Sequence, residues 1–525
     1  MRKRKKLVES QIRAPVVKAS GYSEGGASTQ KDSLRAWRPQ RLSAKSDIDA
    51  NLELLRGRAA DLATNTPIGA AATVTSVMRT VGVGLRLFPK VPYRTLGITP
   101  AQARDWGRAV AQEFNLWADS KDCDLYRRNN FYDLQSIAYA AYLTDGDSFV
   151  LFRRKAASFT PYSLRLQVLE SNRISNPGVA SFGVEARNPK NGNKIVNGIE
   201  VDKDGAMVAY WVCNKVPSDY SDLATAAEWT RVEAFGRRMG LPNMLQVCHD
   251  TRPEQYRGVP YLAPVIENLK QVGRYCNAEL TSAIIRSFLS VFFTNTSPSN
   301  TVDNILPDPF AQGNDGADEP VADPARYHLG PGTLNSLPRG VDVKTVDSAQ
   351  TQSVYDTYMT HLEKGIAAAL NIPHEVLFKS FNSSYSSSRA ALLQAQDEFK
   401  TRRHWFAADF CQPIYEQWLT EAIALGRIEA PGFFDDHVIR KAWCEADWYG
   451  PTMSILDPQR DVNGAALRIL YGLSTREREA AEMTGSDLED NLEQLAYEKS
   501  LIEGLGLSIG VPAVLAGKEE GGEEK

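Results

Sequence analysis

The sequence predicts an α+β fold in which a mixed body carries a projecting pair of long helices. Two observations lead to this prediction. Residues 47–144 show helical periodicity, whereas residues 148–247 contain short runs with strand character, so helices and strands are segregated and do not alternate as βαβ units. Further along, two amphipathic helical patterns flank a loop-rich stretch, which indicates a rod with an insert at its tip.

Composition is that of a soluble globular protein large enough for several domains. The 525 residues are 43% hydrophobic and 24% charged. The formal net charge of −4 excludes a generally cationic nucleic-acid binder, because tight DNA binding requires many Lys and Arg contacts to phosphates. It leaves DNA open as a passing partner, since a protein that lets DNA slide should lack a dense basic lining.

Metal, cofactor and membrane binding are not expected. The six cysteines are far apart, without a CxxC pair or a Cys/His cluster, so neither a structural zinc site nor another cofactor is predicted. Isolated cysteines fit a reducing compartment. The basic start is not followed by an apolar run, and the most apolar window, Ala283–Phe293, is short and contains Arg286.

The first 46 residues are predicted to form a mobile basic arm. Arg2 to Lys6 are consecutive cations, and a Gly/Ser-containing linker follows at Gly21–Ser28. A solvated tail is the favoured interpretation. The alternative is a contact with nucleic acid or with an acidic partner surface.

Four helices and a strand are predicted next. Thr66-Pro67 and Thr99-Pro100 each combine a good N-cap with a proline suited to the first turn. Gly82 and Gly84 end the second helix before a short strand. The predicted helices are 47–63, 67–81, one from 100 through at least 117, and 131–144, and the strand is 85–88.

Short strands fill the following section. Leu164, Leu166 and Val168 alternate with polar residues, which is typical of a half-buried strand, and Asp204-Gly205 is a hairpin turn signal. The predicted strands are 148–153, 163–169, 195–201, 206–213, 229–234 and 244–247.

The predicted rod consists of a helix that starts after Pro260 and a second helix that Pro373 ends. A first helix of roughly 30 residues would span about 45 Å. The insert between them is acidic up to Asp323, with a short strand at 341–346. The apolar stripes are Leu262, Val265, Ile266, Leu269, Val272, Cys276, Leu280, Ile284, Ile285 and Phe288 in the first helix, and Val354, Tyr358, Leu362, Ile366 and Leu370 in the second.

The C-terminal third is predicted to be helical. A helix from Arg389 should kink at Pro413, because proline removes a hydrogen bond and clashes with the preceding turn. Ser474 with Glu477 and Ser486 with Glu489 have the spacing of capping boxes. The chain ends in a Gly-containing acidic tail.

Enzyme constellations are scarce. The six histidines are scattered, and neither GxSxG nor GxxxxGK[ST] occurs. Asp145-Gly146-Asp147 could supply paired metal carboxylates, but a turn before a strand is favoured, and Asp435-Asp436 reads as a helix N-cap. The prediction is a protein without catalysis. A nucleic-acid-processing enzyme that uses Asp145 and Asp147 remains the alternative.

One stretch, His249–Pro260, is dense in charge and amide groups directly before the first long helix. The favoured interpretation is a rigid connector, because its prolines restrict the chain, Gly258 permits a tight turn, and Arg side chains can bridge carboxylates. The alternative is a loop that contacts another subunit or nucleic acid. The candidate residues are His249, Arg252, Gln255 and Arg257.

Four stretches, taken in order, give a resemblance to the lambda-type portal proteins of tailed bacteriophages. Together they span residues 45–505, and the connector is the most specific of them. The sequence departs from the family at Trp448–Pro451, which carries extra residues, and in the acidic insert near 303–323. The stretches are Leu55–Leu62 running on to Gly82–Leu87; His249 with Arg252-Pro253, Gln255 and Arg257–Pro260; Leu370–Leu377 followed by Tyr385–Ala391; and Asp457-Pro458, Ala465-Ala466 and Gly472–Ser474 leading to Gly485–Asp487.

The resemblance implies a portal fold: an α/β wing, a long-helix stem, a small clip, a tunnel loop with a kinked helix, and a helical crown. By position, these parts follow the basic arm 1–46. They are wing 47–258, first stem helix 259–292, clip 293–349, second stem helix 350–377, tunnel loop 378–388, kinked helix and return to the wing 389–454, crown 455–510 and acidic tail 511–525.

The resemblance also implies a ring, dodecameric in this family, at one capsid vertex of the virion, assembled in the host cytoplasm. The ring would form the channel for DNA packaging and ejection. Its partners would be double-stranded DNA, terminase, head–tail connector proteins, and the major capsid and scaffold proteins, without a membrane. A virion ring that conducts no DNA is a further alternative. The residues expected to face the channel are Lys379, Asn382, Ser383, Ser384 and Tyr385.

Overall fold

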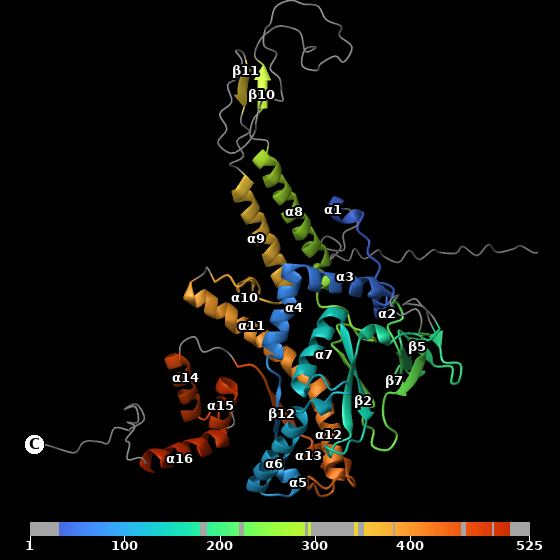
Figure 1. Cartoon of the computed structure of the whole chain (residues 1–525), viewed down its shortest axis with the longest axis vertical. Helices are drawn as coiled ribbons and strands as arrows, with labels where there is room; N and C mark the ends of the chain where they lie inside the picture. Colours follow the sequence, from blue (N-terminus) through green and yellow to red (C-terminus); the bar gives the residue numbers. More distant parts are fainter. Residues whose placement is uncertain are drawn as a thin grey trace, which may run out of the picture.

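Figure 1 shows a mixed body from which two long helices project, with a small strand pair at their far end. The computed structural model describes residues 31–178, 186–219, 225–288, 292–295, 341–344, 351–381, 384–452, 458–485 and 488–504. In this part of the chain, no helix combines the length and the apolar character that a membrane span requires. The basic cluster at residues 2–6, the acidic insert 303–323 and the tail 511–525 lie outside the described residues.

The helices of the body lie where the sequence places them. Thr66 caps α4 and Thr99 forms a full capping box with Gln102 at the start of α6, as their Thr-Pro signals predict. Asn130 and Asp133 form a second box at the start of α7. The helices are α1 (Asp32–Arg35), α2 (Ala44–Ile48), α3 (Leu52–Asn65), α4 (Pro67–Thr80), α5 (Tyr93–Leu96), α6 (Pro100–Ala118) and α7 (Phe131–Asp145).

The predicted helix 47–63 is wrong in its first turn. Ser43 caps the short helix α2, and α3 starts only at Leu52. The Asn51 side-chain amide donates to the carbonyl of Asp47 at 2.9 Å, so it competes with the backbone for a helical acceptor. The chain therefore turns between the two helices.

All sheets of the body are antiparallel, which confirms the α+β prediction. A three-stranded sheet has the order β3-β2-β9 and a five-stranded sheet has the order β4-β5-β6-β7-β8, while β1 pairs with β12. The strands are β1 (Arg86–Pro89), β2 (Asp147–Arg154), β3 (Leu164–Leu169), β4 (Ala186–Arg187), β5 (Lys194–Val196), β6 (Ile199–Val201), β7 (Met207–Cys213), β8 (Trp229–Glu233), β9 (Met244–Cys248) and β12 (Ala446–Tyr449).

The single strand predicted over 195–201 is wrong. The structure divides it into β5 and β6, which form a hairpin around Asn197-Gly198. Both turn residues have positive φ, 46° and 86°, as a type I′ turn requires. The Asn-Gly pair is a strong hairpin signal, and the apolar residues on both sides of it led to the wrong strand prediction.

An aromatic cluster fills the core between α6, α7 and α12. The Phe114 ring lies 5.5 Å from Phe131, 5.9 Å from Tyr415 and 5.1 Å from Trp418 between centroids, all edge to face. All four side chains are buried. The C-terminal half of the chain therefore returns into the N-terminal body, and residues more than 280 positions apart share one core.

The two long helices predicted to project from the body are present, and we call this pair the stem; a short 3₁₀ turn at Ala263–Val265 precedes α8 (Ile266–Phe288). The partner helix is α9 (Thr351–Ala369). Figure 1 shows both helices rising from the body toward the β10–β11 pair, Phe292–Asn295 with Val341–Lys344. The start of the α8 stripe is buried, but Leu280 and Ile284 are 60% and 48% exposed. These two positions of the apolar stripe are therefore exposed in the described part of the stem.

The helix after the Ser-rich loop starts earlier than predicted. After α10 (His374–Phe378), Ser384 caps α11 (Tyr385–Phe406), so residues 385–388 form its first turn instead of loop. The kink predicted at Pro413 takes another form. A π-helical turn at Ala407–Cys411 precedes α12 (Gln412–Ala424), and Pro413 lies in the first turn of α12.

Three helices form a C-terminal cluster beside the body in Figure 1: α14 (Pro458–Leu470), α15 (Arg476–Thr484) and α16 (Leu488–Gly504). Ion pairs join it to the body, from Arg104 of α6 to Glu489 of α16 and from Arg389 of α11 to Asp461 of α14. Thr475, and not the predicted Ser474, caps α15. Ser486 lies outside the described residues. Before this cluster, α13 (His437–Trp443) is capped by Asp436, as predicted.

Two facing glycines permit the close approach of the connector to the body. A Cβ on Gly258 would overlap the carbonyl oxygen of Gly146, and Gly146 has φ of +88°. We expect Gly258→Ala to lower the free energy of unfolding by more than about 3 kcal/mol, beyond ordinary overpacking, because both groups are backbone. Urea denaturation of the purified chain measures this.

Gly57→Ala is the matched control, since a Cβ at Gly57 meets no atom within 4 Å. Gly57 lies inside α3, so this change should be neutral or stabilise by roughly 0.5–1 kcal/mol. Equal losses in the two variants would contradict the close-approach argument.

Candidate functional site at the base of the stem

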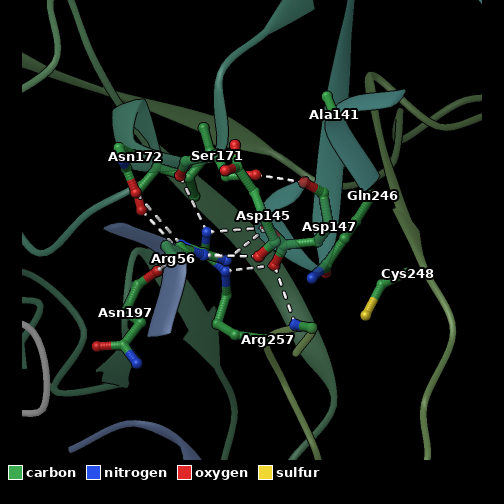
Figure 2. Close-up of polar contacts among 12 residues, drawn as sticks. Arg56, Ala141, Asp145, Asp147, Ser171, Asn172, Asn197, Gln246, Cys248 and Arg257 are labelled. Carbon is green, nitrogen blue, oxygen red and sulfur yellow. Dashed lines mark hydrogen bonds and ion pairs between the residues drawn. The ribbon is translucent and has the colours of Figure 1, made fainter. Parts of the chain in front are cut away.

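The connector 249–260 runs from β9 into the stem and places Arg257 in the interior of the body. Figure 2 shows this arginine beside Asp147, which starts β2, and Arg56, which comes from α3. The side chains of all three residues are at most 2% exposed. Segments that are distant in sequence therefore meet in one buried ionic cluster.

Asp147 binds both arginines at short range. Arg257 Nε donates to Asp147 Oδ2 at 2.6 Å, and Arg56 Nη2 donates to Oδ1 at 2.7 Å. The backbone N–H of Gly258 adds a third contact, to Oδ2 at 3.1 Å. The carboxylate is thus saturated by donors on both oxygens and has no free position for a metal ion or a substrate.

Arg257 also satisfies backbone carbonyls from three other places. Its Nη1 donates to the carbonyls of Ile174 at 2.8 Å and Asn197 at 2.6 Å, and its Nη2 donates to that of Ser171 at 2.9 Å. The guanidinium carbon lies 5.2 Å from the centroid of the Phe149 ring. A single side chain therefore links the connector to both sheets of the body.

The charges of the cluster set the protonation of its members. Burial alone would raise the pKa of Asp147, but the positive charges of Arg257 and Arg56 outweigh burial and lower this pKa to about 2. Burial lowers the pKa of Arg56 to about 10, and Asp147 opposes that shift. Both partners are therefore ionised at neutral pH.

Two further carboxyl groups near the cluster behave in the opposite way. Burial raises the pKa of Asp145 to about 6, although Arg56 lowers it. Burial likewise raises the pKa of Asp49 to about 6. Asp145 and Asp147 are thus not an equivalent pair, because Arg56 takes the side chain of Asp147 and only the backbone carbonyl of Asp145, at 2.7 Å.

The other connector residues make contacts within the chain. Gln255 accepts from the Arg252 backbone N–H at 3.2 Å and donates to the Arg257 carbonyl at 2.9 Å, so it braces the loop. Arg252 binds Asp47 Oδ2 at 2.6 Å, which ties the connector to α2. The His249 ring lies 5.1 Å from that of Trp405. These contacts agree with the rigid-connector interpretation.

A second polar cluster joins the base of the stem to α11. The Tyr261 hydroxyl donates to the Leu370 carbonyl at 2.5 Å, and Arg402 Nη2 reaches the same carbonyl at 3.2 Å. Asn371, whose φ is +54°, donates from its side chain to Glu398 Oε2 at 2.5 Å. This cluster fixes the start of the first stem helix and the end of the second against the helix that follows the Ser-rich loop.

The Ser-rich loop is described only in part. Lys379 is exposed and has φ of +55°, which turns the chain away from α10. Ser384 is exposed and caps α11. Asn382 and Ser383 lie outside the described residues. Tyr385 is the first residue of α11.

No group of three or more His, Cys, Asp or Glu side chains in the described ranges could hold a metal ion. Burial raises the pKa of the Cys123 and Cys444 thiols, so neither is an activated nucleophile.

Sequence reasoning found Arg257 but missed the residues that bind it. Arg56 belongs to the Leu55–Leu62 stretch and was assigned no role, and Asp147 was weighed only as a metal carboxylate or a turn residue. Ser171 and Asn197 were not singled out. The signal that could have found them is a charged residue, such as Arg56 or Asp147, within an otherwise apolar stretch. A buried arginine requires a buried carboxylate partner.

The comparisons with known proteins agree with the resemblance. A family model described as phage portal protein, lambda family, matches residues 30–403. The chain is 26% identical to the portal protein of Escherichia phage N15, covering 96% of this chain and 94% of that protein. It is 25% identical to portal protein B of Escherichia phage lambda, covering 91% and 89%.

A solved structure of the neck of a native gene transfer agent particle, computed with C12 symmetry, matches with a TM-score of 0.42 and 12% identity. That match covers 81% of this chain and 92% of the other. The family model covers most of this sequence, and the curated relatives match along nearly their whole length. The chain belongs to the lambda family of phage portal proteins.

Proposed function

We propose that twelve copies of this chain form a ring at one capsid vertex, through which double-stranded DNA enters and leaves. One observation carries the proposal: in a chain of the portal family, two long helices project from a mixed body and end in a separate strand pair. Copies arranged around an axis would place these rods side by side as the wall of a channel.

The exposed upper stem supports a ring over an isolated chain. Leu280, Ile284 and Tyr358 are each about half exposed or more, although they belong to apolar stripes. A neighbouring stem would cover these side chains. Burial of large apolar side chains is favourable, and exposed apolar patches often mark protein interfaces. The proposed docking partners are terminase during packaging and head–tail connector proteins afterwards, with capsid and scaffold proteins around the wing.

The segment from 378 to 388, which includes the first turn of α11, is proposed to face the channel. Lys379 and Ser384 are exposed, and the loop leaves the base of the stem at the cluster of Tyr261 and Arg402. Small polar side chains with a single cation can contact a polyanion without gripping it, because weak neutralisation of phosphates gives weak binding. Asn382, Ser383 and Tyr385 complete the proposed lining.

Asp145 and Asp147 are proposed to be structural, and the chain is proposed to have no catalysis of its own. Two arginines and a backbone N–H occupy both oxygens of Asp147. A nuclease carboxylate needs at least one oxygen free for a metal ion. The energy for DNA movement would come from the terminase.

Electron microscopy of the purified full-length chain tests the proposed ring. We expect closed rings, twelve-fold in symmetry, with an axial opening that admits a B-form duplex and with residues 379–385 on the inner wall. An opening too narrow for a duplex would favour a virion ring that conducts no DNA. A 379–385 loop on the outer surface would refute its assignment to the channel.

Replacing Asp147 tests the structural role of the carboxylate. We expect Asp147→Asn to lower the free energy of unfolding by about 3–5 kcal/mol, because two buried arginines lose their ionic partner. Since the pKa of Asp147 is about 2, the wild-type contribution is complete above about pH 4 and is lost as pH falls toward 2. Denaturant titrations at pH 7 and pH 3 measure both effects.

Magnesium-dependent DNA cleavage by the wild type, lost in the Asp147→Asn variant at unchanged stability, would support the enzyme alternative.

Asp145→Asn should act in the opposite direction. A carboxyl group whose pKa rises from 3.8 to about 6 on folding is penalised when it ionises, so wild-type stability decreases as pH rises from about 4 to 6. The neutral amide should remove this decrease and stabilise the protein at pH 7.5 by an amount on the order of 2 kcal/mol. Thermal unfolding between pH 4 and 8 measures the profile, and an unchanged pH dependence would contradict the assignment.

A further inference from the structure

A short segment before α2 is fully exposed and carries a tryptophan among arginines. We call residues 35–41 the strap. All seven residues are exposed, and Trp37 is 68% exposed. Arg35 lies on one side of Trp37, with Arg38 and Arg41 on the other. Tryptophan and arginine are the residue types most concentrated at the energetic centres of protein interfaces.

The strap leaves the body from a fixed point. Arg252 Nη2 donates to the Leu42 carbonyl at 2.8 Å, and Ser43 caps α2 directly afterwards. Four residues separate Leu42 from Trp37, so an extended strap can place the Trp37 backbone at most about 18 Å from this anchor.

One exposed face of α3 carries a shallow, open hollow, which we call the α3 hollow. Its volume is about 540 Å³. A Cβ at Gly57 would meet no atom within 4 Å, and the neighbouring Leu54 is 57% exposed. The lining residues are Ala50, Glu53, Leu54, Gly57, Arg58 and Asp61.

The charges of the hollow complement those of the strap. Glu53, Gly57 and Asp61 are spaced four residues apart, so the glycine lies between two exposed carboxylates on one helix face, each about 6 Å away along the axis. The strap has the matching order, with arginine on both sides of Trp37. Asp61 also accepts from Asn65 at 2.7 Å, and Arg58 is a like charge at the rim. The two carboxylates on α3 are thus opposite in charge to the arginines of the strap, of which Arg35 lies 3.9 Å from Asp32 of its own chain.

We propose that the strap of one copy docks on the α3 hollow of the next copy in the ring, with Trp37 over Gly57 and against Leu54. This inference rests on the proposed ring. Within a single chain the strap residues are exposed and the hollow is open, so neither surface satisfies the other. In a closed ring each copy gives one strap and receives another, which is the arrangement of a heterologous interface.

Cysteine cross-linking in assembled full-length rings tests the contact. The double variant Trp37→Cys with Gly57→Cys should form disulfides between copies under mild oxidation, giving a ladder of chain multiples on a non-reducing gel. Gly57→Cys should fold, because its side chain enters open space. Each single variant and the pair Trp37→Cys with Ala278→Cys, an exposed position on α8, are controls that should give no ladder above the wild type.

Charge exchange supplies a second measurement. Adding Glu53→Lys and Asp61→Lys to the double-cysteine variant should lower the cross-link yield at least about fivefold, the effect of roughly 1 kcal/mol from reversed exposed charges. Arg35→Glu with Arg38→Glu in the same chain should restore the yield. A merely local disturbance of α3 would not be reversed by changes in the strap.

Four outcomes would overturn the inference. An internal disulfide, seen as a monomer of altered mobility, would place the strap on its own α3. Rings without the cross-link would contradict this contact but not the proposed function. Photo-cross-linking of Trp37 variants to duplex DNA alone would show that the strap contacts nucleic acid instead. Absence of rings in micrographs of the wild type would overturn the proposed function and this inference together.

Discussion

The buried pairing of one carboxylate with two arginines is the constraint on which the rest of the structure depends. Arg257 immediately precedes the Gly258–Pro260 turn into the stem, Asp147 starts the central strand of the three-stranded sheet, and Arg56 lies in the middle of α3. The stem can leave the body in only one direction, because the same turn brings Gly258 against Gly146 and its N–H onto Asp147. Short hydrogen bonds thus restrain the direction of the stem, and the apolar packing at its base is consistent with that direction.

A polar cluster suits this position better than apolar side chains would. Hydrophobic residues of equal volume could match or exceed a buried ion pair in stability, since desolvation offsets much of the Coulomb attraction. Apolar contacts are not directional, however, whereas Arg257 reaches three backbone carbonyls and one carboxylate in a single geometry. In the proposed ring, the stem angle must agree among the copies, and such a directional restraint at its base would secure that agreement.

The sequence predicts the elements of this fold better than their contacts. Thr-Pro starts and stripes of period 3.6 are local signals, and they placed α4, α6, α7, α8 and α9 within a few residues. The errors occurred where side chains compete with the backbone, as at Asn51, Ser384 and Asn197-Gly198. Within the candidate site, Arg257 was predictable from its dense surroundings. Its partnership with Asp147 was not, because nothing local encodes a pairing across 110 residues.

The unequal burial along the stem links the fold to assembly. Near the body, Leu262, Val265, Leu269 and Val272 pack against Ile366 and Leu370, so the base is complete within one chain. Farther out the same stripe continues in sequence, but Leu280 and Ile284 face solvent. A helix that is surrounded by solvent does not require an apolar stripe. Apolar side chains stabilise a fold or an assembly only where another surface buries them. The inner part of the stripe thus packs on the chain's own second helix, and in the proposed ring its outer part would contact a neighbouring copy.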